Sequence, residues 1–122
     1  MSKIELSKII DSTVSELTKI KIGLLVRATL PEILELELIS ELEVVKLTQS
    51  DYSKMTLDLN YPVLRLVDEK KSIKENRIIS EYTRYYAKPH NYKDSRYLIS
   101  SEWYEKSQLD YIKWLKRKVQ IS

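Results

Sequence analysis

The segment Ile78-Ile-Ser-Glu-Tyr-Thr-Arg-Tyr-Tyr-Ala87 is rich in the β-branched and aromatic residues that favour strands. It is followed by Lys88-Pro-His-Asn-Tyr-Lys-Asp-Ser95, which is dense in turn formers, and by Arg96-Tyr-Leu-Ile-Ser100, which returns to a strand composition. This succession predicts a β-hairpin with strand 78–87, turn 88–95 and strand 96–100. Most of the remaining chain has the apolar spacing of helices. We therefore expect an α+β protein that is mainly helical, with a β-hairpin in its C-terminal half.

The N-terminal residues predict one long helix and a short strand. Ser2-Lys-Ile-Glu5 has the spacing of a capping box, and apolar residues then recur at helical intervals, which predicts a helix over 3–20. Gly23 lies where a left-handed C-cap would end such a helix. Residues 24–28 are short and apolar, as in a brief strand.

A second capping box starts the next helix. Thr29 and Glu32 have the required spacing, and Pro31 lies in the first turn, so a helix is predicted over 30–43. Residues 34–38 also alternate like a strand. Leucine and glutamate are strong helix formers, so the helix is favoured.

A third helix is expected over 49–58, with Tyr52, Met55 and Leu59 facing inward. The proline that follows stops it, because the residue before a proline avoids helical dihedral angles. Residues 63–67 are apolar and fit either a helix or a strand.

The chain is expected to end in a helix over 102–118, capped by Ser100 or Ser101. Trp103 and Trp114 should share its inward face. That face comprises Trp103, Tyr111, Ile112, Trp114, Leu115 and Val119.

The expected order is helix, short strand, helix, helix, strand, turn, strand, helix. This order resembles the winged-helix variant of the helix-turn-helix domain, with the hairpin as the wing and the last helix available for dimerisation. The resemblance implies that helix 49–58 reads the major groove of DNA. That helix carries one cation, Lys54, beside Asp51 and Asp58, and residues 60–76 separate it from the wing. A generic α+β domain with a hairpin packed under helices fits the same order.

The composition excludes several classes of site. The 122 residues are expected to form a single domain over 1–122, with the charged segment 68–76 as the candidate internal boundary. The absence of cysteine and the presence of one histidine and one glycine exclude disulfides, zinc–thiolate sites and glycine-rich nucleotide loops. We expect no metal ion, no cofactor and no membrane segment. With neither a signal sequence nor cysteine, a cytoplasmic location is expected.

Charge and aromatic residues are unevenly distributed. Residues 1–60 carry seven basic and ten acidic side chains, a net charge of −3, whereas residues 61–122 carry fourteen and eight, a net charge of +6. Eight of the nine tyrosines and both tryptophans also lie in the second half. Cations neutralise phosphates and flat rings stack on bases, so this combination favours nucleic-acid binding. The simpler alternative is that the rings form the core and the lysines its solvated rim.

The predicted hairpin supplies the candidate binding residues. Because side chains alternate along a strand, Tyr82, Arg84, Tyr86 and Lys88 are expected to share its outward face. With the return strand and the last helix added, the predicted nucleic-acid contacts are Arg84, Tyr86, Lys88, Arg96, Lys116, Arg117 and Lys118. The alternative is cross-strand packing of tyrosine on arginine without a ligand.

Two sequence patterns contain residue types that are used in catalysis. His90 lies among turn residues beside Asp94 and Ser95 and is expected to be an exposed turn histidine, because no orienting partner is evident. Asp58, followed by Glu69-Lys-Lys71, has the spacing of a magnesium-dependent nuclease. Those carboxylates fall at a helix end and in a loop rather than on adjacent strands.

We therefore expect a small non-enzymatic protein that binds DNA or RNA, or has a regulatory role, through its basic, tyrosine-rich C-terminal half. The alternative is a protein–protein interaction module, such as an adaptor or inhibitor, and a magnesium-dependent nuclease is a remote alternative. The amphipathic helices are expected to face the core, the other option being a homodimer.

Overall fold

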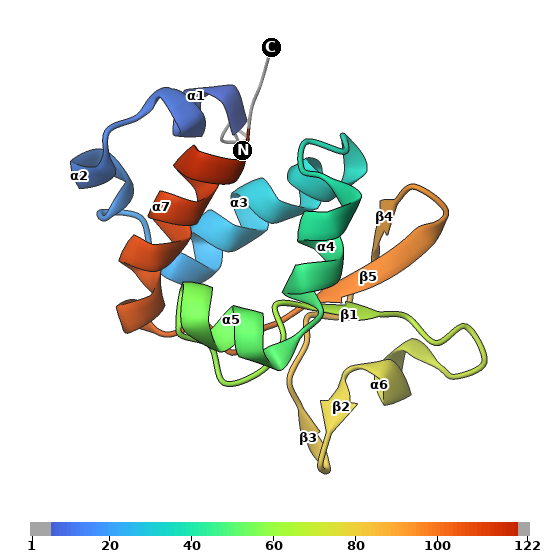
Figure 1. Ribbon diagram of the computed structural model, residues 1–122. Coiled ribbons are helices and arrows are strands. Elements are labelled where there is room, and N and C mark those ends of the chain that lie inside the picture. Colours follow the sequence, from blue (N-terminus) through green and yellow to red (C-terminus); the bar gives the residue numbers. More distant parts are fainter. Residues whose placement is uncertain (1–5, 120–122) are drawn as a thin grey trace.

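Within the described part of the chain, five helices precede the first strand, a sixth lies between the first and second strands, and a seventh follows the last strand. The computed structural model describes residues 6–119 (Figure 1). The helices are α1 (Leu6–Asp11), α2 (Val14–Leu17), α3 (Ile22–Glu35), α4 (Glu41–Leu47), α5 (Ser50–Leu57), α6 (Ile73–Asn76) and α7 (Gln108–Lys118), with a 3-10 turn, η1 (Glu105–Ser107). The strands are β1 (Leu64–Leu66), β2 (Ile78–Ile79), β3 (Tyr82–Thr83), β4 (His90–Tyr92) and β5 (Ser95–Ile99). The fold class is therefore α+β, as predicted.

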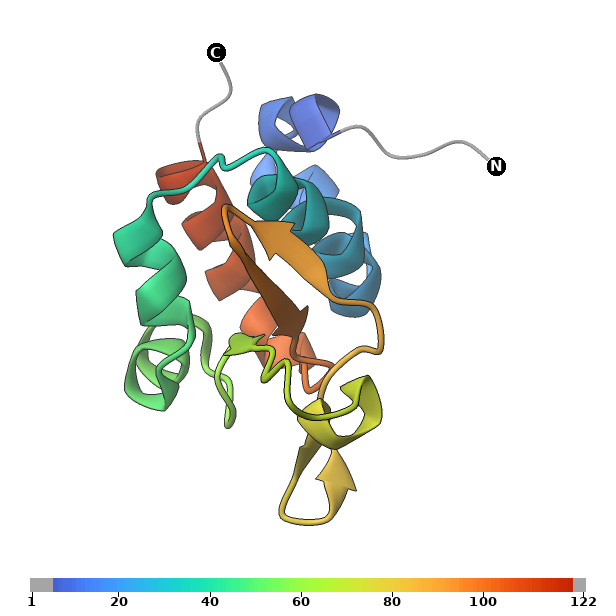
Figure 2. The same ribbon diagram turned by 90° about the vertical axis from the view of Figure 1, so that its right-hand side faces the viewer.

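The main sheet has three antiparallel strands in the order β1-β5-β4. Its centre is β5, where Tyr97 pairs with Leu66 of β1 on one side and with His90 of β4 on the other. Helices α3, α4 and α7 lie on one side of this sheet (Figures 1 and 2). Ile99 and Tyr97 pack on that side in the main core, whereas Leu98 joins a small second core on the other face.

The predicted strand 78–87 is wrong as one continuous strand. The short strands β2 and β3 pair with each other, because Ser80 and Glu81 both have positive φ angles, of 49° and 75°, and turn the chain back. This small hairpin projects from the rest of the molecule (Figures 1 and 2). Its side chains therefore do not continue the face expected for Tyr82.

The hairpin on β5 is formed later along the chain than predicted. Residues 84–86 run beside the end of β5, where the Tyr86 N–H donates to the Ile99 carbonyl (2.9 Å). After a break, β4 pairs with β5 across a turn that contains Lys93, with a φ of 52°. The predicted turn 88–95 thus contains a strand, and the predicted return strand 96–100 nearly coincides with β5.

The predicted helix over 3–20 is interrupted. Its capping box at Ser2 and Glu5 lies outside the described residues, and the helix divides into α1 and α2. Thr13 caps α2 in a reciprocal capping box with Glu16. These side-chain to backbone hydrogen bonds compete with the hydrogen bonds of a continuous helix, and the helix is interrupted there.

Helix α3 extends over residues where the sequence predicts a C-cap, a brief strand and the start of another helix. Gly23 has no positive φ angle and residues 24–28 are helical, so the predicted C-cap and brief strand are both wrong. Thr29 is not a cap: it is buried inside the helix, where its hydroxyl donates to the Leu25 carbonyl (2.7 Å). Pro31 lies inside the helix as well. A continuous buried stripe holds this helix against the core, namely Leu25, Val26, Leu30, Ile33 and Leu34.

The predicted helix over 30–43 also divides. Helix α3 ends at Glu35, and Ser40 caps the separate helix α4. Glu37, with a φ of 53°, makes the break between them. The winged-helix resemblance lacks its expected first strand, because residues 24–28 are helical, and it remains an interpretation of element order.

The prediction of a helix over 49–58 is confirmed by α5, but one of the three side chains expected to face inward faces solvent. Leu59 is buried, but Met55 is 82% exposed. Residues 63–67, whose composition fits either a helix or a strand, contain β1. The charged segment 68–76 contains α6, a single turn capped by Ser72.

The last helix is shorter than predicted. Tyr111, Ile112, Trp114, Leu115 and Val119 are buried as expected. Trp103 is half-buried and lies before the helix, because its indole N–H donates to the Ser100 carbonyl (2.7 Å) in a local turn.

No helix within residues 6–119 is long and apolar enough to cross a membrane.

A buried carboxylate joins three of the helices. Glu43 of α4 is 5% exposed and accepts hydrogen bonds from the Trp114 indole of α7 (2.8 Å) and the Tyr52 hydroxyl of α5 (2.5 Å). Burial raises the pKa of Glu43, but these hydrogen bonds and the charge of Lys118 outweigh it and hold the pKa below 4.5. Burial of Tyr52 and its bond to Glu43 raise the pKa of the Tyr52 hydroxyl to about 12.

Replacing Gly23 by alanine tests the helical assignment. A Cβ at this position would lie 3.5 Å from the Tyr86 hydroxyl, an ordinary contact. We expect the free energy of unfolding to rise by about 0.4–1 kcal/mol, because alanine restricts the unfolded chain. Urea unfolding measures the change. A left-handed C-cap at Gly23 would give the opposite sign, since alanine is strained there.

The Glu43 carboxylate should stabilise the fold in a pH-dependent way. Its folded pKa lies below its unfolded value, so its contribution is complete above pH 4.5 and is lost as the pH falls through the folded pKa. Glu43→Gln should lower the free energy of unfolding by about 1–3 kcal/mol near pH 7, and this difference should shrink in acid. Glu41→Gln, at an exposed position of the same helix, is the control and should have little effect. A stability difference between the parent and Glu43→Gln that is constant from neutral pH to below pH 4.5 would contradict the assignment.

Candidate functional site

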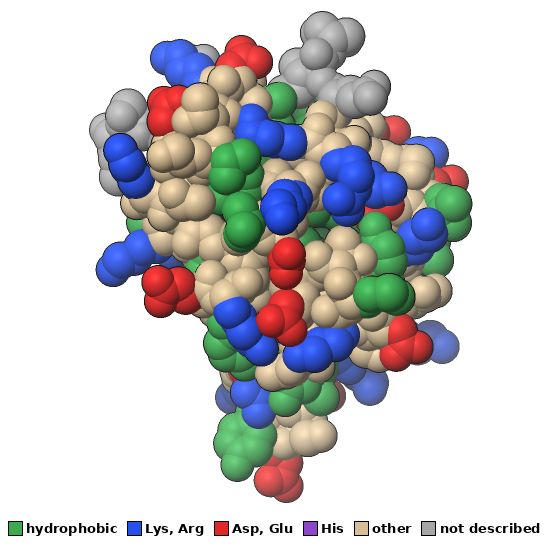
Figure 3. Space-filling view, turned by 60° about the vertical axis from the view of Figure 1, so that its left-hand side comes forward, with side chains coloured by type: hydrophobic (Ala, Val, Ile, Leu, Met, Phe, Trp, Pro, Cys, Tyr) green, Lys and Arg blue, Asp and Glu red, His purple; other side chains and the backbone are tan. Residues whose placement is uncertain are grey.

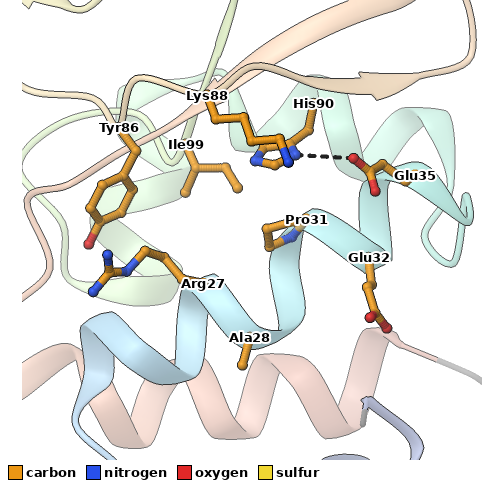
Figure 4. A pocket seen from close by; sticks show the side chains of 9 residues that line it. All are labelled: Arg27, Ala28, Pro31, Glu32, Glu35, Tyr86, Lys88, His90 and Ile99. Carbon is orange, nitrogen blue, oxygen red and sulfur yellow. Dashed lines mark hydrogen bonds and ion pairs between the residues drawn. The ribbon is translucent and has the colours of Figure 1, made fainter. Parts of the chain in front are cut away.

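A cavity of about 340 Å³ lies between helix α3 and the sheet; we call it the α3–β4 pocket (Figure 4). It is lined by Arg27, Ala28, Pro31, Glu32, Glu35, Tyr86, Lys88, His90 and Ile99. This size is at the lower end of the range for small-molecule sites. The lining mixes a ring, cations and carboxylates, and it brings together residues that are far apart in the sequence.

The helical wall of the pocket follows from helix geometry. Arg27, Pro31 and Glu35 are spaced four residues apart on α3, so they lie along one face. Glu35 reaches toward the sheet at one end of the pocket, and Arg27 lies at the other end (Figure 4). The wall therefore has a cation at one end and a carboxylate at the other.

The opposite wall is the segment that leads from Tyr86 into β4. Tyr86, Lys88 and His90 occupy alternate positions, and all three line the pocket. Tyr86 and Lys88 therefore lie in one pocket, although neither belongs to a strand. The expected face is not shared by Tyr82 and Arg84, which lie away from the pocket.

His90 is held by a carboxylate from the other wall. Its Nδ1 is 3.2 Å from Oε1 of Glu35, and the residue is 8% exposed. The expectation of an exposed turn histidine is therefore wrong, because β4 packs on α3 and covers the ring. The two residues are 55 positions apart in the chain, so no local spacing points to the pair.

Arg27 and Tyr86 form a cation–π pair at the other end of the pocket. The guanidinium carbon lies 5.1 Å from the ring centroid. The Tyr86 hydroxyl lies close to Gly23, 3.5 Å from the position that a Cβ would take there. Within residues 6–119, neither Arg27 nor Lys88 forms an ion pair, so both cations are available to a ligand.

A second hollow, of about 560 Å³, adjoins the pocket, because Arg27 lines both. Lys19 and Lys21 line it from the connection between α2 and α3. Gln108 fixes this connection by donating its side-chain amide to the carbonyls of Leu17 and Thr18, each at 3.2 Å. The hollow extends the set of accessible cations beyond the pocket.

Arg84 and Arg96, two of the predicted contacts, are bound within the protein. Arg84 is paired with Glu102, and its guanidinium lies 4.9 Å and 5.0 Å from the ring centroids of Tyr61 and Tyr82. Arg96 donates two hydrogen bonds to Glu69, one of 3.0 Å from Nε. These bonds lower the pKa of Glu69. Both arginines therefore contribute to folding contacts.

The three predicted cations of the last helix also lie away from the pocket. The Lys116 ammonium donates to the Ile10 carbonyl (3.0 Å) at the end of α1, and Lys118 lies 3.5 Å from Glu43. Arg117 is exposed. On the face shown in Figure 3, basic and acidic side chains are interspersed rather than gathered in one patch.

The carboxylates of the nuclease-like spacing have separate partners. Asp58 lies 2.9 Å from Lys54 and 3.3 Å from Lys106, and these bonds lower its pKa. Glu69 is bound to Arg96. Across residues 6–119, no three His, Cys, Asp or Glu side chains are grouped so that they could hold a metal ion.

The structure thus unites two of the predicted contacts, Tyr86 and Lys88, with three residues that the sequence did not point to. Arg27 and Glu35 belong to the acidic half of the chain, and His90 was expected in a turn. The sequence signal for this wall is the spacing of Arg27, Pro31 and Glu35, four residues apart on one helix, whereas the sequence patterns predict two different elements there. Comparison with known protein families, curated proteins and solved structures found no match.

Proposed function

We propose that the chain binds single-stranded nucleic acid in the α3–β4 pocket, and that it does so in the cytoplasm. The observation that carries the proposal is the convergence of the Arg27–Tyr86 pair with Lys88 in one pocket. Aromatic rings stack on bases of any sequence, and nearby cations neutralise the backbone.

Some cations of the chain already have partners within the protein and others do not, and this difference indicates which of them can contact a nucleic-acid backbone. Arg84, Arg96, Lys116 and Lys118 are bound to carboxylates or carbonyls of the chain itself. A phosphate would have to displace those partners. Four other cations line the two adjoining hollows, namely Lys19, Lys21, Arg27 and Lys88, and these form the proposed backbone path.

The shape of the site favours single strands over duplexes. A base can enter a pocket only when it is unpaired and unstacked, and the bases of a duplex are held in the stack. Glu32 and Glu35 also line the pocket, so the site is not uniformly basic. We therefore expect few phosphate contacts and a moderate dependence on salt.

Fluorescence anisotropy with labelled oligonucleotides of about 12 nucleotides tests the proposal. The double variant Arg27→Ala with Lys88→Ala should weaken binding to single strands. It should also reduce the slope of log affinity against log salt by about 1.4, since each lost phosphate contact contributes about 0.7. Tyr86→Leu should cost about 1–3 kcal/mol of binding free energy on single strands, and much less on a duplex.

The control for this experiment has the same change in charge. Lys70 and Lys74 are exposed cations outside both hollows, so the double variant Lys70→Ala with Lys74→Ala should keep the parent's affinity and salt slope. Equal losses in the two double variants would show a diffuse charge effect and contradict the pocket. The absence of binding by the parent at low salt would end the proposal.

A separate surface favours the alternative role as a protein-interaction module. Arg84 lies between the rings of Tyr61 and Tyr82, and Tyr82 is 63% exposed on the projecting β2–β3 hairpin. Tyrosine and arginine are enriched in protein interfaces. Binding of a protein partner through this surface would be only weakly sensitive to salt. Tyr82→Ala would weaken that binding and leave the affinity for nucleic acid unchanged.

A further inference from the structure

We propose that the α3–β4 pocket also cleaves RNA, by attack of a ribose 2′-hydroxyl on the adjacent phosphate. This inference rests on the proposed binding of single strands and goes beyond it, and it departs from the expectation of a non-enzymatic protein. Its basis is the meeting of His90, Glu35, Lys88, Arg27 and Tyr86 in one pocket. Every side chain proposed to take part lines this pocket.

His90 has the arrangement of a general base. Its Nδ1 faces Oε1 of Glu35 at 3.2 Å, so Nδ1–H donates to the carboxylate and Nε2 keeps its lone pair. A carboxylate on one ring nitrogen fixes the tautomer and stabilises the imidazolium that forms when the other nitrogen takes a proton. Burial of the ring against α3 limits its movement. Glu35 is accordingly a positioning residue, and His90 is the group that accepts the proton.

Lys88 and Arg27 supply the positive charge that the reaction requires. Phosphoryl transfer develops negative charge on the non-bridging oxygens, and fixed cations in a pocket stabilise it. Both cations lack an ion pair within residues 6–119, whereas most of the cations predicted from the sequence are already bound. The Lys88 ammonium also carries the proton that the leaving oxygen needs.

The apolar part of the pocket has a role in binding the substrate. Pro31 and Ile99 line the space between the two charged ends, and the Tyr86 ring lies beside Arg27 at one of them (Figure 4). A base placed against them would leave its sugar and phosphate toward Lys88 and His90. Stacking of this kind tolerates any base, so we expect cleavage to have little sequence preference.

The proposed step balances in atoms and protons. The 2′-oxygen forms a bond to phosphorus while its proton moves to Nε2 of His90. The bond from phosphorus to the 5′-oxygen breaks, and that oxygen takes a proton from Lys88. The products are a 2′,3′-cyclic phosphate and a 5′-hydroxyl end. Exchange with water returns a proton to Lys88 and removes one from His90.

The test uses an RNA of about 12 nucleotides with a fluorophore and a quencher, in buffer containing EDTA. The full-length protein should cleave it and leave 2′,3′-cyclic phosphate ends, which mass spectrometry identifies. The same sequence as DNA or as 2′-O-methyl RNA should bind but remain intact, because neither offers the attacking hydroxyl.

Variants assign the roles. His90→Ala should lower kcat by about 10²–10⁴-fold, and added imidazole should restore part of it. Lys88→Ala, at an exposed position where the fold is not at risk, should lower kcat by about 10²–10³-fold. Glu35→Gln should lower kcat by up to about 10²-fold with KM unchanged, as expected for a positioning residue. Lys74→Ala, outside the pocket, should retain the parent's rate and serves as the control.

The outcomes separate this inference from the proposed function. Binding of 2′-O-methyl RNA without cleavage of RNA would overturn the inference and leave the binding proposal standing, whereas failure to bind either oligonucleotide would end both. Cleavage that persists undiminished in Lys88→Ala and His90→Ala would identify a contaminating ribonuclease and overturn the inference. Imidazole rescue of His90→Ala distinguishes a lost base from a misfolded protein, and circular dichroism of each variant confirms the fold.

Discussion

The hydrogen bond from the Trp114 indole to the buried carboxylate of Glu43 fixes the helices on which the sheet rests. Glu43 also accepts from Tyr52, and the Trp114 ring stacks on Tyr111 with centroids 5.6 Å apart. The Tyr111 hydroxyl lies 2.6 Å from that of Thr29 in α3. One connected set of contacts therefore joins α3, α7, α4 and α5. A buried carboxylate is costly unless its oxygens are bonded, so the set favours one arrangement of these helices, and that arrangement positions α3 beside β4.

The pocket is a consequence of this placement. Three alternate residues, Tyr86, Lys88 and His90, meet a helical face that repeats every four residues from Arg27 to Glu35. Neither wall is a site by itself. Helix α3 supplies the Glu35 carboxylate, which orients the imidazole, and the Arg27 guanidinium, which lies over the Tyr86 ring, while β4 supplies the imidazole and the segment before β4 supplies the ring. Binding and the proposed cleavage thus depend on the same packing of helix on sheet.

Charge segregation along the sequence is an incomplete guide to the surface of this protein. The second half has a net charge of +6, yet Arg84, Arg96 and Lys118 are each matched by a carboxylate. Two of those carboxylates, Glu69 and Glu102, come from the same basic half. The accessible cations of the pocket come one from each half, Arg27 and Lys88. Net charge counts residues, whereas binding depends on which charges lack a partner after folding.

The sequence by itself determined the α+β class, the strand at β5, the helix at α5 and the buried face of α7, because these depend on local composition and periodicity. It also predicted that Tyr86 and Lys88 lie on one side of the chain, and both line the pocket, although neither belongs to a strand. The tertiary structure decided the rest. Positive φ angles at Ser80 and Glu81 turn the chain back, so the predicted strand becomes two short strands that pair with each other. Packing against the core keeps α3 helical through Thr29, where a helix start was predicted. The pairing of His90 with Glu35 joins residues 55 positions apart, and no local pattern encodes such a contact, because it exists only once helix and sheet have packed together.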